Sequence, residues 1–302
     1  MIDWSKSEKL PPEKRYFNIS VIWIFYFRQV IKLFYHLRIP HEIVTVLSII
    51  FGLAAAWFFY DGALIVAVLL LHFKDVFDAA DGALARLTGR GHLIGRYLDS
   101  LGDFLALTAV MGAVAVAGWH QGEPVYLFWG ILAIFSTFIQ CSFFNYYQLA
   151  YTEVYGIETL SSKRDERRRD DLETAAYGTA GRVLLGILRG LYMAVYGWQD
   201  RLVARVDNYL AATSGTELTA TERFGKRVLM VMQSALCFGT HIFVIIVFAV
   251  LGRPTHALIF IATLMNIYLL VLLYLRSSYY KSITARPAAE TDPGGRIIGD
   301  KG

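Results

Sequence analysis

Long apolar runs separated by short polar turns dominate the chain. A helix needs about 20 mainly apolar residues to cross a lipid bilayer, and six segments qualify. These segments are residues 43–59, 62–85, 97–119, 125–151, 228–252 and 257–275. The second and third reach this length only by including aspartates, which places acidic residues where one helix ends and the next begins. The pattern predicts an all-α polytopic membrane protein with six transmembrane helices.

Residues 16–37 are also apolar, but Arg28 and Lys32 lie one helical turn apart within them. This spacing predicts an N-terminal amphipathic helix that lies in the membrane interface rather than a seventh span. The distribution of basic residues supports six spans rather than seven, because Lys and Arg accumulate in cytoplasmic loops. They occur in the loop at 86–96, whereas the loop at 120–124 has none. We therefore expect both termini in the cytosol.

Composition agrees with a membrane protein, since 56% of the residues are hydrophobic and 15% are aromatic. The net charge of +4 is mild, and no nucleic-acid-binding motif is present, so nucleic acid is not an expected partner. Cys141 and Cys237 both lie in apolar runs. They predict core thiols and indicate neither a disulfide framework nor a zinc site.

The chain divides into five regions by these patterns. Residues 1–40 form the cytosolic N-terminus and interfacial helix, 41–151 the first four spans, 152–227 a cytosolic or interfacial insertion, 228–280 the last two spans, and 281–302 a disordered tail. In the insertion, the mixed charge run at 163–171 predicts a solvated helix or a disordered loop, with contact to anionic lipid headgroups as the alternative. Helical spacing of apolar residues from Val183 to Trp198 predicts a second interfacial helix.

Four aspartates lie at the boundary between the second and third spans. Asp78 and Asp81 share one face of a helix, and Asp99 and Asp103 share one face of the next. A charged side chain in hydrocarbon costs at least about 2.5 to 3.5 kcal/mol, so the cluster predicts paired ions, bound metal or a watery cavity. Because hard divalent cations prefer oxygen ligands, we expect a metal site for a phosphate-bearing compound. The alternative is that these acids are solvated residues at helix ends.

The same stretch resembles the signature of the CDP-alcohol phosphotransferase (phosphatidyltransferase) family, D-x-x-D-G-x-x-A-R followed by eight residues and G-x-x-x-D-x-x-x-D. All eight specified positions are filled, by Asp78, Asp81, Gly82, Ala85, Arg86, Gly95, Asp99 and Asp103. The resemblance implies a membrane phospholipid synthase that transfers a phosphatidyl group from a CDP-linked lipid, such as CDP-diacylglycerol, to an alcohol and releases CMP. It also implies two Mg²⁺ or Mn²⁺ ions and a homodimer. We expect the protein in the cell inner membrane, with its active site facing the cytosol.

By this resemblance, the metal ligands would be Asp78, Asp81, Asp99 and Asp103, and Asp103 would also be the general base for the acceptor hydroxyl. Contacts to the nucleotide and the donor would come from Glu42, Thr45, Gly82, Ala85, Arg86, His92 and Gly95. Glu42 departs from the asparagine that the family often has there, and His92 from a small hydroxyl residue. An exposed turn residue is the alternative for His92.

Three charged residues near the motif are candidates for contact with the acceptor: Lys74, Asp75 and Arg96. The alternatives are that Lys74 and Asp75 pair with each other or with a neighbouring helix, and that Arg96 only marks the cytoplasmic side.

Two other functions fit intramembrane acids. The first is a cation transporter that uses the carboxylates as an ion site. The acids cluster at one boundary, with Arg86 in the same turn, rather than at the midplane, and this favours the enzyme. The second is a catalytically silent relative with a scaffolding role, which the four intact aspartates argue against.

Overall fold

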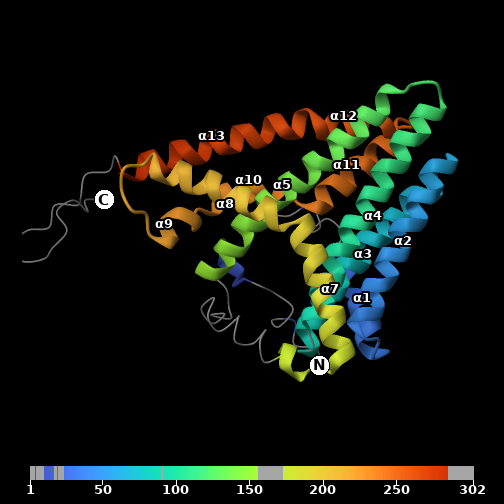
Figure 1. The fold of residues 1–302 in the computed structure, drawn as a ribbon, viewed down its shortest axis with the longest axis horizontal. Coiled ribbons are helices and arrows are strands. Elements are labelled where there is room, and N and C mark those ends of the chain that lie inside the picture. The colour runs from blue at the N-terminus through green and yellow to red at the C-terminus, as the bar shows by residue number, and fades with distance from the viewer. Residues whose placement is uncertain are drawn as a thin grey trace, which may run out of the picture.

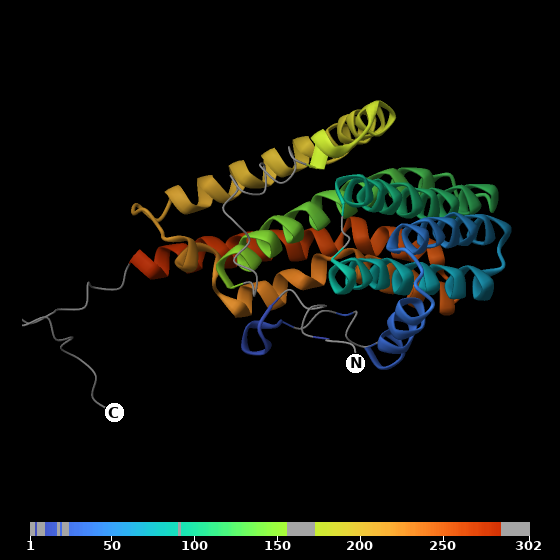
Figure 2. The same cartoon turned by 90° about the horizontal axis from the view of Figure 1, so that it is seen from below.

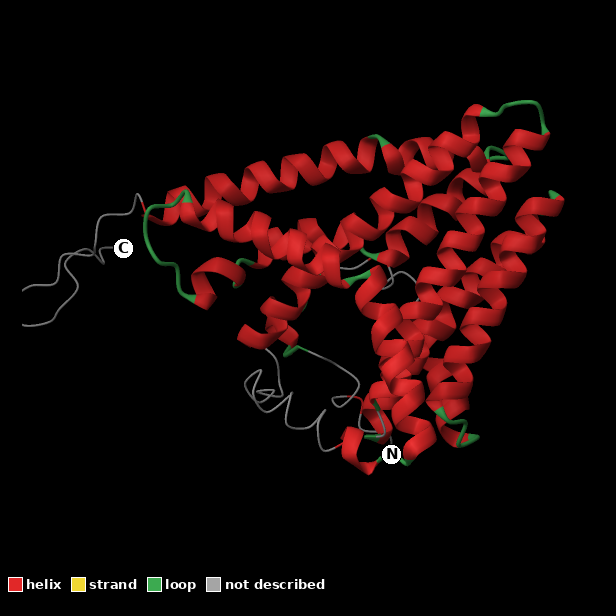
Figure 3. Ribbon diagram, viewed as in Figure 1, coloured by secondary structure: helices red, strands yellow, loops and turns green. Residues whose placement is uncertain are grey.

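The computed structural model of the chain describes residues 4, 10–16, 19, 24–89, 92–155 and 173–284. These residues form helices joined by short turns, with no strand among them (Figure 3). The predicted all-α class is confirmed for this part of the chain. The charge run at 163–171, Arg90 and the predicted tail beyond residue 284 lie outside the described residues.

Four long helices run up and down beside one another and carry the acidic motif (Figure 1). They are α2 (His41–Asp61), α3 (Leu64–Thr88), α4 (Leu93–His120) and α5 (Val125–Tyr155). At the end of α3, Gly89 adopts a left-handed conformation with φ of 64°, and its N–H bonds to the carbonyls of Ala85 and Arg86. Only glycine enters this conformation without strain. The chain can therefore turn sharply and return as α4, which places the acids of both helices at the same end.

Two glycines bring the backbones of α2 and α4 close together. A Cβ on Gly52 would lie 2.6 Å from the Cβ of Ala106, and a Cβ on Gly102 would lie 2.4 Å from the Ile49 side chain. A larger residue at Gly52 would force the helices apart, whereas one at Gly102 would require the Ile49 side chain to turn away. Small residues at such crossings are typical of helices that pack inside a membrane. The contact fixes the start of α2 beside the acidic ends of α3 and α4.

The N-terminal helix α1 (Ile24–His36) lies within the segment 16–37 predicted to be amphipathic. Ile31 and Phe34 are buried in a small apolar cluster with residues of α2 and α3, whereas Arg28 and Lys32 are exposed. The place of this helix in a membrane interface stays a prediction.

The insertion forms helices that lie along one face of the bundle, opposite α1 (Figure 2). They are α7 (Thr179–Val195) and α8 (Gly197–Ala212); the short α9 (Ala220–Phe224) follows and packs against α5. The helix predicted from Val183 to Trp198 therefore changes direction at Tyr196. α7 packs against α4, and α8 packs against α5. A buried Asp207 on α8 accepts hydrogen bonds from Tyr147 and Tyr280 and pairs with Arg223, which ties the insertion to α5 and to the C-terminal helix.

The C-terminal part contains two broken helices. The predicted span 228–252 consists of α10 (Arg227–Gln233), a 3₁₀ turn η4 (Ser234–Leu236) and α11 (Phe238–Val250), with a bend of 47°. The last predicted span, 257–275, is longer in the structure and consists of α12 (Pro254–Ala262) and α13 (Leu264–Thr284). Buried polar side chains hold these helices to α5, because Gln140 bonds to both His241 and Asn266 at 2.8 Å.

Within the described residues, four helical segments are long and apolar enough to cross a membrane, or five if the bent pair forms one span. They are His41–Asp61, Leu93–His120, Val125–Tyr155, Pro254–Ile283 and the bent pair from Arg227 to Val250. The predicted second span, 62–85, corresponds to α3, which is a helix but is not among them. Its second half is interrupted by Lys74 and several aspartates, so its mean hydropathy is lower than that of its neighbours.

Candidate active site

The structure gathers the four motif aspartates between α3 and α4. Asp81 is buried, and Asp78, Asp99 and Asp103 are half-buried. Asp99 is close enough to Asp78 and Asp81 for direct electrostatic interaction, and Asp78 interacts in the same way with Asp103. The helical spacing seen in the sequence therefore does turn the two acid faces toward each other.

Lys74 lies among these acids. It stands one turn before Asp78 on α3, and only 3% of its side chain is exposed. Its ammonium group is 3.4 Å from Asp78 and forms an ion pair and hydrogen bond with Asp103 on α4. A buried ammonium needs such partners to offset its lost hydration. The pairing with a neighbouring helix, one of the alternatives for Lys74, is thus present, and its contact with an acceptor stays a prediction.

The first turns of α2 reach into the same cluster. The Thr45 hydroxyl donates a hydrogen bond to Asp81 at 2.5 Å, and its oxygen lies 3.1 Å from the His41 carbonyl. The Arg86 guanidinium also interacts with the Asp81 carboxylate, and it lies 3.4 Å from where a Cβ on Gly82 would stand. A side chain at position 82 would therefore be in van der Waals contact with this guanidinium.

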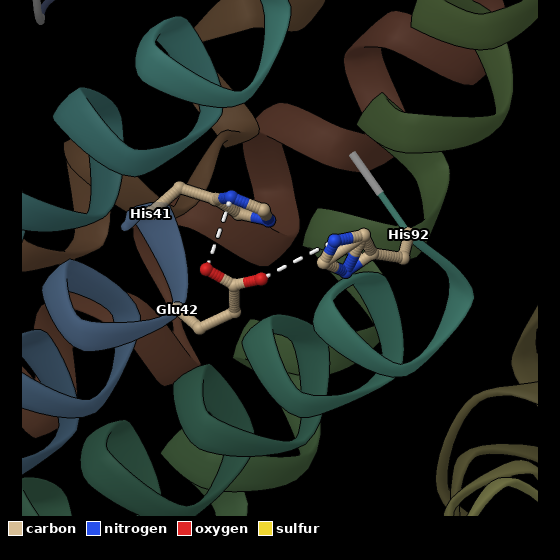
Figure 4. Close-up of side chains that lie close together, drawn as sticks. All are labelled: His41, Glu42 and His92. Atoms are coloured by element: carbon tan, nitrogen blue, oxygen red, sulfur yellow. Dashed lines mark ion pairs between the residues drawn. The ribbon is translucent and has the colours of Figure 1, made fainter. Parts of the chain in front are cut away.

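Two further predicted residues, Glu42 and His92, meet at the same ends of α2 and α4, together with His41 (Figure 4). Gly95 packs on this group, since a Cβ there would lie 3.4 Å from Nε2 of His41. Arg96 is exposed on α4. The structure thus brings most of the predicted residues to one end of the bundle, in two neighbouring groups.

Two contacts from the insertion hold α4 in place, and neither could be found from the sequence pattern. The backbone N–H of Leu93, at the start of α4, donates to Glu173 at 2.6 Å. The Tyr196 hydroxyl donates to the carbonyl of Ser100, next to Asp99, at 2.9 Å. Burial raises the pKa of the Tyr196 phenol, so the group stays protonated and remains a donor. In the sequence, Tyr196 is only one more aromatic residue between two apolar helices.

Comparison with known proteins decides the family. A sequence profile described as CDP-alcohol phosphatidyltransferase matches residues 39–194, which is just over half of the chain. The chain belongs to the CDP-alcohol phosphatidyltransferase family. The resemblance seen in the motif is thereby confirmed, and the family match continues through much of the insertion. Membership favours a transferase of substituted phosphate groups over a cation transporter.

One relative is an archaetidylinositol phosphate synthase of Pyrococcus horikoshii, which is 32% identical to this chain over 88 residues. The aligned part is 29% of this chain and 46% of that protein, so the chain spans about half the length of the curated relative. Apolar helices and family membership together identify an integral membrane protein of lipid metabolism.

The acidic cluster has the donor type that suits the divalent ions this family uses, but among the described residues no three of its carboxylates have ligand atoms within 4.8 Å of one another, so these side chains would have to turn toward a bound ion. The cluster's donors are carboxylate oxygens, which hard cations such as Mg²⁺ and Mn²⁺ prefer. Five aspartates lie in or beside it when Asp75 is included, and Lys74 and Arg86 supply two positive charges. The aspartates therefore outnumber the two cationic side chains. Excess negative charge in a poorly hydrated site favours bound cations.

Proposed function

We propose that this protein is a membrane phospholipid synthase that moves a phosphatidyl group from a CDP-linked lipid, such as CDP-diacylglycerol, to an alcohol and releases CMP. The observation that carries the proposal is the meeting of the four motif aspartates between α3 and α4, with Thr45 bonded to one of them. The family match supports the same chemistry.

In this proposal, two Mg²⁺ or Mn²⁺ ions are held by Asp78, Asp81, Asp99 and Asp103. Such ions neutralise charge on the phosphoryl and leaving-group oxygens during an in-line displacement. Asp103 accepts the proton of the attacking hydroxyl as general base. Since Lys74 pairs with Asp103 in the structure, the acceptor hydroxyl must compete with this ammonium for the carboxylate.

The nucleotide end of the donor is assigned to the starts of α2 and α4. Thr45 and Arg86 flank Asp81 and supply a hydroxyl and a guanidinium, the groups that suit phosphate oxygens. Gly82, Ala85 and Gly95 supply bare or nearly bare backbone, which lets a nucleotide approach closely. Glu42 and His92 complete the predicted donor contacts from the same two helix starts.

We infer a six-span topology in which α3 also crosses the membrane, as the second span in chain order, and α1 lies in the cytosolic interface. The acids of α3 and α4 lie at one end of the bundle, on the side of the basic loops, so the active site faces the cytosol under the positive-inside rule. An inner-membrane location and a homodimer complete the proposal.

The relative's name suggests where to look for the acceptor. It describes a synthase of archaetidylinositol phosphate, so an inositol phosphate is the first alcohol to test. A phosphorylated acceptor requires cationic contacts, and Arg96 on α4 is an exposed candidate. Lys74 and Asp75 are the buried candidates.

The decisive experiment supplies purified protein with Mg²⁺, CDP-diacylglycerol and a panel of alcohols and alcohol phosphates. The readouts are CMP release and identification of the lipid product by mass spectrometry. Asp103→Asn should lower turnover about 10²- to 10⁴-fold, the range for loss of a general base. Asp61→Asn, at the exposed far end of α2, is the matched control. Metal-independent release, or near-normal turnover in Asp103→Asn, contradicts the proposed mechanism.

A further inference from the structure

Two histidines and one glutamate converge outside the aspartate cluster (Figure 4). His41 and Glu42 open α2, and His92 stands immediately before α4. Nδ1 of His41 is 3.3 Å from one carboxylate oxygen of Glu42, and Nε2 of His92 is 3.3 Å from the other. The three ligand atoms all lie within 4.8 Å of one another, and among the described residues no other such group of three occurs.

These three side chains are buried on the side of His41 and exposed to solvent on the side of Glu42 and His92. Only 8% of the His41 side chain is exposed, and its ring rests against α4 where Gly95 has no side chain. That contact uses Nε2, so Nδ1 is the nitrogen that faces Glu42. The side chains of Glu42 and His92 are 39% and 42% exposed. An ion from solvent can therefore reach the group without passing through the helix bundle.

The separations are also compatible with a shared metal ion, since each histidine nitrogen lies 3.3 Å from one of the two Glu42 oxygens. A charge-assisted hydrogen bond between nitrogen and carboxylate oxygen is about 2.7 to 2.9 Å long, shorter than both contacts here. Two ligand atoms at about 2.0 to 2.1 Å from a tetrahedral ion lie about 3.3 Å from each other. Imidazole nitrogen with one carboxylate is a donor set of Zn²⁺ sites, whereas the oxygen-only donors of the aspartate cluster suit Mg²⁺ and Mn²⁺.

We propose that His41, Glu42 and His92 bind one Zn²⁺ ion at a site separate from the four aspartates. Each histidine provides one nitrogen, and Glu42 provides the carboxylate between them, with one oxygen facing each ring. Bound there, the ion ties the start of α2 to the start of α4, the two helix ends that flank the acidic motif.

Zinc binding to the full-length, tag-free protein in detergent tests this site directly. After treatment with EDTA, Zn²⁺ is titrated in competition with a chromogenic chelator, in the presence of excess Mg²⁺ to saturate the aspartates. We expect one tightly held Zn²⁺ per chain. His92→Ala and Glu42→Gln should each weaken it at least about 100-fold, since loss of even an indirect metal partner costs 10- to 100-fold. His120→Ala, an exposed histidine at the far end of α4, should leave the affinity unchanged.

A second measurement uses the unaltered protein and does not depend on any variant folding. Co²⁺ in place of Zn²⁺ should give the intense visible absorption of a four-coordinate ion, and Zn²⁺ should abolish it. The proposal is overturned if Co²⁺ gives only weak six-coordinate absorption, or if the protein binds no stoichiometric Zn²⁺. It is also overturned if His92→Ala and Glu42→Gln bind Zn²⁺ as tightly as the unaltered protein. Both measurements report binding rather than turnover, so their outcome is independent of the transferase proposal.

Discussion

Replacing Lys74 with methionine should destabilise the protein when divalent ions are absent. Lys74 is 3% exposed and pairs with both Asp78 and Asp103. Methionine retains most of the side-chain volume but leaves two carboxylates without their cation. Removing one partner of a buried ion pair costs about 3 to 5 kcal/mol, which corresponds to a fall in melting temperature of roughly 10 °C for a chain of this size.

Divalent ions should reverse most of this loss. In the variant, Mn²⁺ can neutralise the two acids without displacing an ammonium group, and two unit charges 4 Å apart interact with about 4 kcal/mol at an effective dielectric constant near 20. Mn²⁺ should therefore stabilise Lys74→Met more than it stabilises the unaltered protein, and it should bind the variant more tightly.

Thermal unfolding in detergent, followed by circular dichroism in EDTA and in Mn²⁺, measures both effects. Lys32→Met, an exposed lysine on α1, is the control for loss of one positive charge. If Lys74→Met melts within about 2 °C of the unaltered protein in EDTA, less than 1 kcal/mol was lost, and Lys74 is not the cation of this site. If Mn²⁺ stabilises both proteins equally, the lysine and the metal do not share the same acids.

Three other substitutions test neighbouring contacts. Thr45→Val keeps the side-chain shape but removes the hydroxyl bonded to Asp81, so the midpoint of unfolding should report a loss of about 1.5 to 3 kcal/mol; an unchanged midpoint would show that the bond is absent in solution. Tyr196→Phe should cost about 0.5 to 1.5 kcal/mol for one buried hydrogen bond and lower turnover in the CMP-release assay, and full activity would separate the insertion from catalysis. Gly52→Ala should cost about 1 to 3 kcal/mol through overpacking against α4, whereas Gly112→Ala, with nothing within 4 Å of the added carbon, should not destabilise.

The sequence predicted the helices well wherever apolarity alone defines them. The span predicted at 43–59 lies within His41–Asp61, and the span at 125–151 lies within Val125–Tyr155. Hydropathy did not predict the bend in 228–252, because apolar residues continue through it. The 3₁₀ turn at η4 depends on packing against α5 and α10, which a single sequence does not display.

The candidate site likewise has a part that the sequence pattern predicts and a part that depends on tertiary packing. Helical periodicity predicted that the aspartates of α3 and α4 would share a face, and the structure brings them together. The meeting of His41 with His92 depends on how α2 crosses α4 and required the structure. So did the contact of Tyr196 with α4, because residues 96 positions apart in sequence carry no common periodic signal.

The glycine contacts between α2 and α4 carry a consequence for how such an enzyme diversifies. Where Gly52 touches α4, an added Cβ would lie 2.6 Å from the Cβ of Ala106, so a larger residue there pushes the two helices apart. Relatives that keep the same acids on α4 are therefore expected to keep a minimal residue at the position of Gly52, because a larger one would shift α2 relative to α4.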